Sequence, residues 1–170
     1  MNLGITIIKS RHSVRKFRKT PVEAGIVHDA LECARLAPTA RNEQPWLFGV
    51  VTNPEIRARI AALTEHGKFI ADAPVCFAVF GQREAMYYLE DCCAATENLI
   101  IALQSYGVGS CWVAGEKKPY AGPVRELLGV PPQYTLVSLV AAGFPEDITI
   151  TRKKDPEAVT FFEHFTPDTT

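Results

Sequence analysis

Apolar residues along this chain fall into two patterns, short continuous runs and stripes with a helical spacing. The short runs are rich in β-branched and aromatic residues and are bounded by Gly, Pro or polar clusters, which is typical of buried strands. They lie at residues 47–52, 75–80, 110–114 and 135–142. Because they alternate with the helical stripes, we expect an α+β or α/β sandwich around one sheet. No internal repeat or linker interrupts the sequence, so we expect one domain over residues 1–170.

Two of the stripes predict helices in the first half of the chain. The first helix begins at Thr20–Glu23, which reads as a capping box with Pro21 at the first helical position, and it stops before Pro38. The second begins at Asn53–Pro54 and ends by Gly67. The apolar stripes consist of Val22, Ile26, Ala30 and Ala34 in the first helix and of Ile56, Ile60 and Leu63 in the second.

The longest predicted helix runs from about Glu84 to Tyr106, and Gly107 supplies its C-terminal stop. Within it, Leu99–Leu103 is apolar nearly all the way round. A helix that is apolar on every face needs cover on every face. A second copy of the chain would supply that cover, and so would a central position in the core of a monomer. The pattern leaves both arrangements open.

The composition is that of a soluble globular protein, with 47% hydrophobic and 22% charged residues over 170 positions. A net charge of −1 provides no global field for nucleic acid or anionic lipid, so we expect neither nucleic-acid nor membrane binding. Lys9, Arg11 and Arg15 interrupt any signal-peptide core, and no apolar run reaches the roughly 18 residues of a membrane span. These features favour a cytoplasmic location.

Five cysteines lie at positions 33, 76, 92, 93 and 111 without a CxxC spacing or a histidine at ligand spacing, so we expect reduced core thiols and no metal site. A redox pair of Cys92 and Cys93 is the alternative, but neighbours on a helix diverge by about 100°. The sequence has no Ser-His-Asp order, Walker loop or paired-carboxylate constellation. The segment Gly107–Gly109 lacks the third glycine of a dinucleotide-binding fingerprint.

Two polar segments are candidate binding elements. Residues 38–46, PTARNEQPW, place small hydrogen-bonding groups between two prolines directly before the first predicted strand. The prolines restrict the backbone and predict a preordered binding loop, although an ordinary surface loop has the same residue types. In residues 11–17, an extended backbone puts Arg11, Ser13 and Arg15 on one side, a ladder of donors suited to phosphate and carbonyl oxygens.

These segments resemble the FMN-dependent nitroreductase family, in which an Arg-x-Ser-x-Arg/Lys ladder and a Pro-Ser/Thr-x-x-Asn-x-Gln-Pro-Trp loop hold the flavin. Further pieces follow in family order, namely Ala73–Pro74, residues 108–115 (VGSCWVAG), Gly143–Pro145 and Arg152–Lys154. The resemblance covers almost the whole chain. It implies an α+β fold, a three-layer α/β/α sandwich whose central, mostly antiparallel sheet is flanked by helices. It also implies a homodimer with FMN sites at the subunit interface.

The resemblance implies specific roles in cofactor binding. Arg11, Arg152 and Lys154 would neutralise the phosphate, although Arg152–Lys154 alone reads as a solvated charge run. Ser13 and Arg15 would contact the flavin near its C2 carbonyl and N1. Arg15 would thereby tune the flavin, and no side chain would itself be catalytic, because flavin N5 carries the chemistry.

The proline-bounded loop would reach the flavin from the partner subunit in such a dimer. Its implied contacts are Pro38, Thr39, Ala40, Asn42 and Gln44. The backbone amides of Ala114 and Gly115 would reach N5 and the C4 carbonyl, and His12 and Lys68 complete the implied set. Ala40 cannot donate the hydroxyl that some relatives have there, and Ala114 replaces a common Glu. Trp112 reads as a core residue or a flavin-stacking one, and candidate lid residues are Met86, Tyr87, Tyr88 and Tyr120.

The reaction that the resemblance implies is hydride transfer in two halves. NADH or NADPH would reduce the flavin at N5, and a nitroaromatic, quinone or enone would then take the same stacking position. One shared face implies ping-pong kinetics. The alternative is a flavin-binding protein that stores, senses or fragments FMN with little turnover of an external acceptor.

Overall fold

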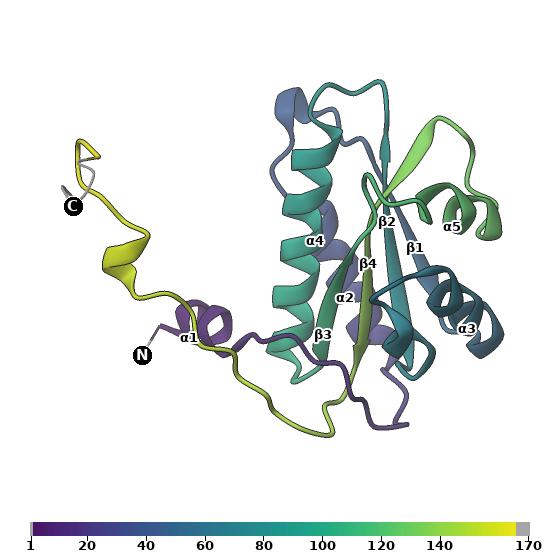
Figure 1. Cartoon of the computed structure of the whole chain (residues 1–170), viewed down its shortest axis with the longest axis horizontal. Coiled ribbons are helices and arrows are strands. Elements are labelled where there is room, and N and C mark those ends of the chain that lie inside the picture. The colour runs from purple at the N-terminus through teal and green to yellow at the C-terminus, as the bar shows by residue number, and fades with distance from the viewer. Residues whose placement is uncertain (1, 166–170) are drawn as a thin grey trace.

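The computed structural model describes residues 2–165 and is built on one antiparallel sheet (Figure 1). The strands are β1 (Trp46–Val51), β2 (Val75–Gln82), β3 (Gly109–Ala114) and β4 (Tyr134–Gly143), in the order β1-β2-β4-β3. Every neighbouring pair is antiparallel, with one register irregularity at Val79/Phe80 in the β2–β4 pairing. The four runs expected to be strands all form this sheet. β1 and β3 are its edges.

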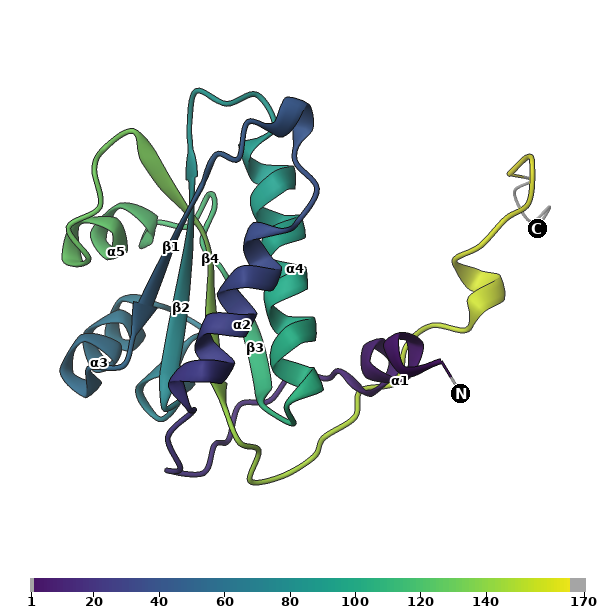
Figure 2. The same ribbon diagram turned by 180° about the vertical axis from the view of Figure 1, so that it is seen from behind.

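Helices cover both faces of the sheet, which makes three layers (Figures 1 and 2). The helices are α1 (Leu3–Ser10), α2 (Ala24–Arg35), α3 (Pro54–Leu63), α4 (Tyr88–Ser105) and α5 (Ala121–Leu127), with short 3-10 turns at Ala40–Asn42, Lys68–Ala71 and Pro156–Ala158. α2 and α4 pack on one face, while α3 and α5 pack on the other. The α/β/α sandwich with a central antiparallel sheet is therefore confirmed.

A separate apolar core fills each space between sheet and helices. On the α2 and α4 side, the core includes Ala30, Phe77, Leu99, Leu103 and Val140. On the α3 and α5 side, it includes Ile60, Phe80, Val124, Leu136 and Leu139. Strand β2 contributes to both cores because successive side chains point to opposite faces. This double cover explains why β2 and β4 are continuous apolar runs.

Two predicted helix starts are wrong by a few residues. α2 begins at Ala24, and its N-cap Glu23 makes no side-chain capping bond, so the predicted capping box does not form. The chain stays extended further because the Arg18 N–H donates to the Phe144 carbonyl (2.8 Å) and ties this segment to the sheet. α4 begins at Tyr88 instead of Glu84. The start of α3 is as predicted, with the Asn53 side chain accepting from two backbone amides.

The apolar stretch Leu99–Leu103 is covered within one chain. Leu99 and Leu103 are fully buried, Ile100 is nearly so, and Ile101 is partly buried. α2 and the sheet provide this cover. The interpretation as a central core helix is therefore correct for this stretch, and the stretch gives no reason of its own to expect a second subunit.

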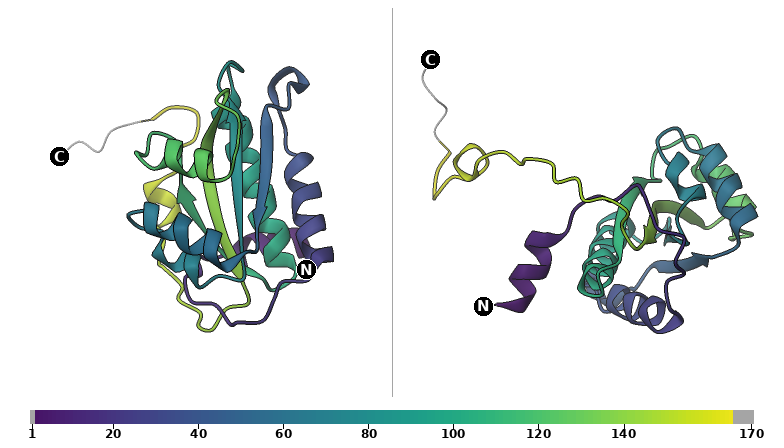
Figure 3. Two further views of the ribbon diagram at one scale, coloured as in Figure 1. Left: turned by 90° about the vertical axis from the view of Figure 1, so that its right-hand side faces the viewer. Right: turned by 90° about the horizontal axis from the view of Figure 1, so that it is seen from below.

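Exposed apolar side chains gather instead on the two ends of the described chain. α1 has no buried residue, and Leu3 and Ile8 are exposed. Residues 147–165 extend away from the sandwich, with Ile150 and Phe162 exposed (Figures 1 and 3). Apolar groups of this size on projecting segments are a mark of surfaces that pack against another molecule. Among the helices within residues 2–165, none has the length and apolarity to cross a membrane.

Candidate functional site

The predicted donor ladder is extended and lies along the free edge of β3. Ser13 forms a parallel bridge with Ser110, and the Val14 N–H donates to the Ser110 carbonyl (2.9 Å). Val14 points inward and is buried, which leaves Ser13 and Arg15 exposed on the outer side. Gly109 permits this close approach, because a Cβ there would lie 2.6 Å from a Val14 methyl group. The extended backbone expected from the Arg-x-Ser-x-Arg spacing is therefore present.

Cys111 on β3 lies next to the ladder, because Ser13 pairs with the neighbouring Ser110. Burial raises the pKa of the Cys111 thiol, and the Arg15 charge, a hydrogen bond from Ser13 and the Arg11 charge oppose that rise. Arg15 also stands over the Phe69 ring, with its guanidinium carbon 5.9 Å from the centroid. These contacts make a cationic wall beside a flat apolar one.

A cavity of about 220 Å³ opens next to this wall. Its lining comprises Arg15, His66, Phe69, Cys111, Trp112, Val113, Ala114, Lys118 and Tyr120. A volume this size lies below the roughly 300–1,000 Å³ of common ligand pockets. One chain therefore supplies only part of a site for a drug-sized molecule.

The two predicted backbone donors at the end of β3 differ in availability. The Gly115 N–H donates to the Val137 carbonyl (2.9 Å), so it is occupied within the sheet. Because donors alternate along an antiparallel ladder, the Ala114 N–H points away from β4 toward the free edge. Gly115 is required for packing, since a Cβ there would lie 2.6 Å from Leu136. Of this pair, Ala114 is the amide that is free to reach a ligand.

The proline-bounded loop is held by Asp91, a residue that the sequence reading missed. The Thr39 hydroxyl donates to one Asp91 oxygen (2.7 Å), and the Ala40 N–H lies 3.3 Å from both. The Gln44 N–H in turn donates to the Thr39 hydroxyl (3.0 Å). Asn42 and Gln44 are exposed beyond this anchor. No local sequence signal linked Asp91 to this loop, because it lies about fifty positions further along the chain.

The loop and the ladder lie at opposite ends of α4 (Figures 1 and 2). Asp91 holds the loop at the N-terminal end, whereas Gln104 donates to the Ser10 hydroxyl (3.1 Å) at the C-terminal end. At 1.5 Å per residue, these two anchors are about 20 Å apart along the helix axis. One chain therefore does not bring Asn42 and Gln44 to Arg11 and Arg15.

The remaining predicted residues have varied surroundings. Lys68 donates to the carbonyls of Ala61 and Ala62 and so caps the C-terminal end of α3. Arg152 is exposed, with its only ion pair in residues 2–165 to Asp155 at 3.4 Å, and Lys154 and Pro38 are also exposed. His12 Nδ1 lies 3.0 Å from the Ser10 carbonyl, while its buried Nε2 has no hydrogen-bond partner within residues 2–165.

The residues considered as flavin-stacking or lid residues differ in how deeply they are buried. Trp112 packs against the core on the α2 and α4 side. Tyr120 is buried and donates to the Ala114 carbonyl, so it belongs to the wall of the cavity and not to a lid. Met86 and Tyr87 are exposed beside the start of α4 and stay candidates for a lid.

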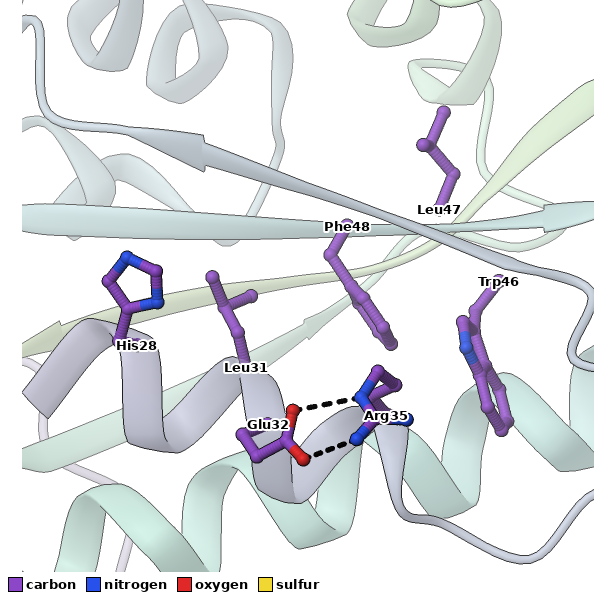
Figure 4. A pocket seen from close by; sticks show the side chains of 7 residues that line it. All are labelled: His28, Leu31, Glu32, Arg35, Trp46, Leu47 and Phe48. Atoms are coloured by element: carbon purple, nitrogen blue, oxygen red, sulfur yellow. Dashed lines mark hydrogen bonds and ion pairs between the residues drawn. The ribbon is translucent and has the colours of Figure 1, made fainter.

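A second groove lies between α2 and the edge strand β1 (Figure 4). It contains none of the predicted cofactor-binding residues, although Trp46, at the end of the proline-bounded loop, lines it. Its volume is about 370 Å³, and its lining comprises His28, Leu31, Glu32, Arg35, Trp46, Leu47 and Phe48. Glu32 and Arg35 form a bidentate ion pair there, and the hydrogen bond from Arg35 lowers the pKa of Glu32. Because these charges neutralise each other, the groove offers no free cation for a phosphate.

Comparison with known proteins identifies relatives of this chain. The nitroreductase family model matches residues 8–67 and 62–144. An Archaeoglobus fulgidus protein, provisionally named NADH dehydrogenase/NAD(P)H nitroreductase, is 31% identical over 149 residues, which is 84% of this chain and 86% of that protein. A provisionally named nitroreductase from Desulfovibrio desulfuricans, solved in complex with FMN, has a TM-score of 0.87 at 27% identity over 98% of this chain and 99% of that one.

The fold itself has many solved counterparts. A provisionally named NADH dehydrogenase/NAD(P)H nitroreductase from Parabacteroides distasonis has a TM-score of 0.92 at 24% identity, over 97% of this chain and 100% of that one. The family model spans most of the sequence, and its match includes the ladder and the proline-bounded loop. The chain belongs to the nitroreductase family.

Proposed function

We propose that this protein is an FMN-dependent oxidoreductase that passes a hydride from NADH or NADPH to a nitroaromatic, a quinone or a similar small acceptor. Family membership and relatives named as NAD(P)H nitroreductases support the oxidoreductase class and the nicotinamide donor. The observation that carries the proposal is the ladder segment paired along the free edge of β3 through Ser13 and Ser110, with Arg15 in the lining of the adjacent cavity.

The residues around this cavity fit FMN. Guanidinium and hydroxyl donors match phosphate and carbonyl oxygens, and the outward Ala114 N–H matches a ring acceptor. The unpartnered, buried His12 Nε2 is a further polar atom that a ligand or a second chain would satisfy. Phe69 and Tyr120 provide apolar walls. When bound, FMN supplies the hydride-accepting and hydride-donating atom, N5, while the chain binds and orients it.

Each residue in the proposed site has a distinct task. Arg11 would anchor the phosphate, with Arg152 and Lys154 added from the projecting segment. Ser13 would hydrogen-bond the pyrimidine edge, and Arg15 would place a fixed positive charge beside it. Ala114 would donate its backbone N–H to the other edge of the ring. Donor and acceptor would use one open face in turn, which corresponds to ping-pong kinetics.

A second copy of the chain completes the proposed site. The ladder and the Asn42–Gln44 segment are about 20 Å apart along α4 in one chain, and the cavity of about 220 Å³ holds only part of a flavin. α1 and residues 147–165 present exposed apolar side chains suited to a subunit interface. We therefore propose a homodimer in which the loop of one subunit meets the ladder of the other.

Stopped-flow reduction tests the proposed reaction. The FMN-loaded protein is mixed anaerobically with NADH or NADPH, and flavin absorbance is followed as it bleaches. The reduced protein is then mixed with a nitroarene, a quinone or oxygen to follow reoxidation. We expect bleaching by at least one nucleotide and recovery with at least one organic acceptor. A protein that binds FMN but is bleached by neither nucleotide would instead store, sense or fragment flavin.

Replacing Arg11 with Ala should weaken FMN binding by about 10-fold to 100-fold, because one charge-assisted phosphate contact is lost. The reduction potential of the flavin that stays bound should change little. Fluorescence titration with FMN measures the affinity. The matched control is Arg59→Ala, which removes an arginine from a separate groove lined by α3 and α5. Equal effects of the two substitutions would contradict phosphate binding by Arg11.

A further inference from the structure

Within residues 2–165, Asp91 is a buried carboxylate whose side-chain hydrogen-bond partners all lie in the proline-bounded loop. Asp91 is 6% exposed, and its carboxylate accepts hydrogen bonds from the Thr39 hydroxyl and the Ala40 N–H. Among residues 2–165, no ion pair involves this carboxylate. It lies in the first turn of α4, where the helix dipole favours a negative charge. The loop therefore provides the direct hydrogen-bond compensation for this buried charge.

A helix-capping role does not account for Asp91. The Asp91 N–H donates to the Tyr87 carbonyl, so its backbone is already inside the helix. Its side chain makes no hydrogen bond to an amide of α4 within the described chain, whereas a capping side chain accepts from the helix it caps. The contacts point outward, across to a segment about fifty positions earlier in the sequence.

The loop needs an external anchor because its backbone is strained. Arg41, Asn42 and Gln44 all have positive φ values, of 53°, 58° and 51°. Asn adopts this left-handed region readily, but Arg and Gln do so at a cost in free energy. Strained residues of this kind persist only where their surroundings hold them in place. The chain of hydrogen bonds from Asp91 to Thr39 and from Thr39 to the Gln44 N–H spans the strained turn.

We propose that Asp91 is the positioning residue of the FMN-binding loop. Its carboxylate fixes Thr39, and Thr39 fixes Gln44, so that the exposed side chains of Asn42 and Gln44 are preformed for the flavin of a second subunit. A preformed loop avoids the entropic cost of ordering at the moment of binding. This inference rests on the proposed function, and Asp91 itself does not touch the cofactor.

Limited proteolysis tests the anchor without any flavin. Arg41 is exposed in the strained turn, so trypsin cleavage after Arg41 reports how often the loop opens. In the full-length protein freed of FMN, Asp91→Asn should speed this cleavage about 10-fold or more, since it removes the charge from two hydrogen bonds. Thr39→Val keeps the side-chain volume but removes the hydroxyl relay, and it should have the same direction of effect. This second variant retains the test if Asp91→Asn fails to fold.

FMN affinity tests the link between the anchor and the cofactor. Fluorescence titration should show FMN binding weakened about 10-fold to 100-fold in Asp91→Asn. The matched control is Val124→Ala, which removes two methyl groups from the core on the opposite face of the sheet. It should lower thermal stability without changing cleavage after Arg41 or FMN affinity. An equal loss of affinity in Val124→Ala would make the Asp91 effect a general loss of stability and overturn the inference.

The remaining outcomes separate the inference from the proposed function. Faster cleavage with unchanged FMN affinity would mean that Asp91 anchors a loop that does not bind the flavin, which overturns the inference alone. Unchanged cleavage in both Asp91→Asn and Thr39→Val would overturn it as well. If the wild-type protein bound no FMN, the proposed function would fail first, and cleavage after Arg41 would still show whether Asp91 anchors the loop.

Discussion

A chain carrying Ile150→Asp and Phe162→Asp is expected to be a folded monomer that has lost most of its FMN. Both side chains are largely exposed, at 79% and 84%, so charges there leave the cores of the sandwich intact. In the proposed dimer they would pack against the partner, and two uncompensated carboxylates would weaken association at least about 100-fold. Flavin should be lost in parallel, because the loop and the ladder of one chain are too far apart to bind it together.

Sedimentation velocity and flavin absorbance, measured on the same samples, check this result. Circular dichroism confirms that the double variant stays folded. Leu63→Asp is the control, since it adds a carboxylate at an exposed apolar position on α3, outside both projecting segments. It should remain dimeric and yellow. A double variant that stays dimeric would contradict the interface, and a fully flavinated monomer would contradict the shared site.

Replacing Arg15 with Ala is expected to lower the two-electron reduction potential of the bound flavin. Reduction adds negative charge near N1, and a fixed guanidinium there stabilises the reduced form more than the oxidised form. A loss of about 1.4 kcal/mol corresponds to about 30 mV for a two-electron couple. Hydride uptake from the nucleotide should slow accordingly. Arg11 and the loop should keep much of the flavin bound.

Spectroelectrochemistry under anaerobic conditions measures this potential. Arg15→Lys retains the charge and should restore most of the wild-type potential, which a purely steric role for Arg15 would not explain. Arg59→Ala, on the far groove, should leave the potential unchanged. A wild-type potential in Arg15→Ala at full cofactor occupancy would mean that Arg15 acts only as a surface charge.

Local patterns were sufficient for most of the secondary structure. The four apolar runs all became strands, and the two central ones, β2 and β4, are apolar along nearly their whole length because both of their faces are buried. Asn53–Pro54 marked the start of α3 correctly, since its capping bonds are formed by neighbouring residues. Thr20–Glu23 has the same kind of helix-start signal, but the helix does not begin there. There the tie between Arg18 and Phe144, which local sequence does not encode, keeps the chain extended.

The sequence predicted those parts of the candidate site whose contacts lie within a few residues of one another. The alternation of Arg11, Ser13 and Arg15 predicted an extended ladder, and the proline-bounded loop was identified from its composition. By contrast, the partner of Thr39 is Asp91 on α4, and only the fold brings these residues together. The occupied Gly115 N–H and the capping role of Lys68 likewise depend on neighbouring elements.

The sequence by itself determined the family, the four strands, three of the five helices, and the residue types available to hold a flavin. These follow from periodicity, turn residues and motif spacing, all of which act over a few residues. Only the tertiary structure decided that Leu99–Leu103 is covered inside one chain and that the loop and the ladder lie at opposite ends of α4. Burial and distance depend on which distant segments pack together, and packing is set by the whole core.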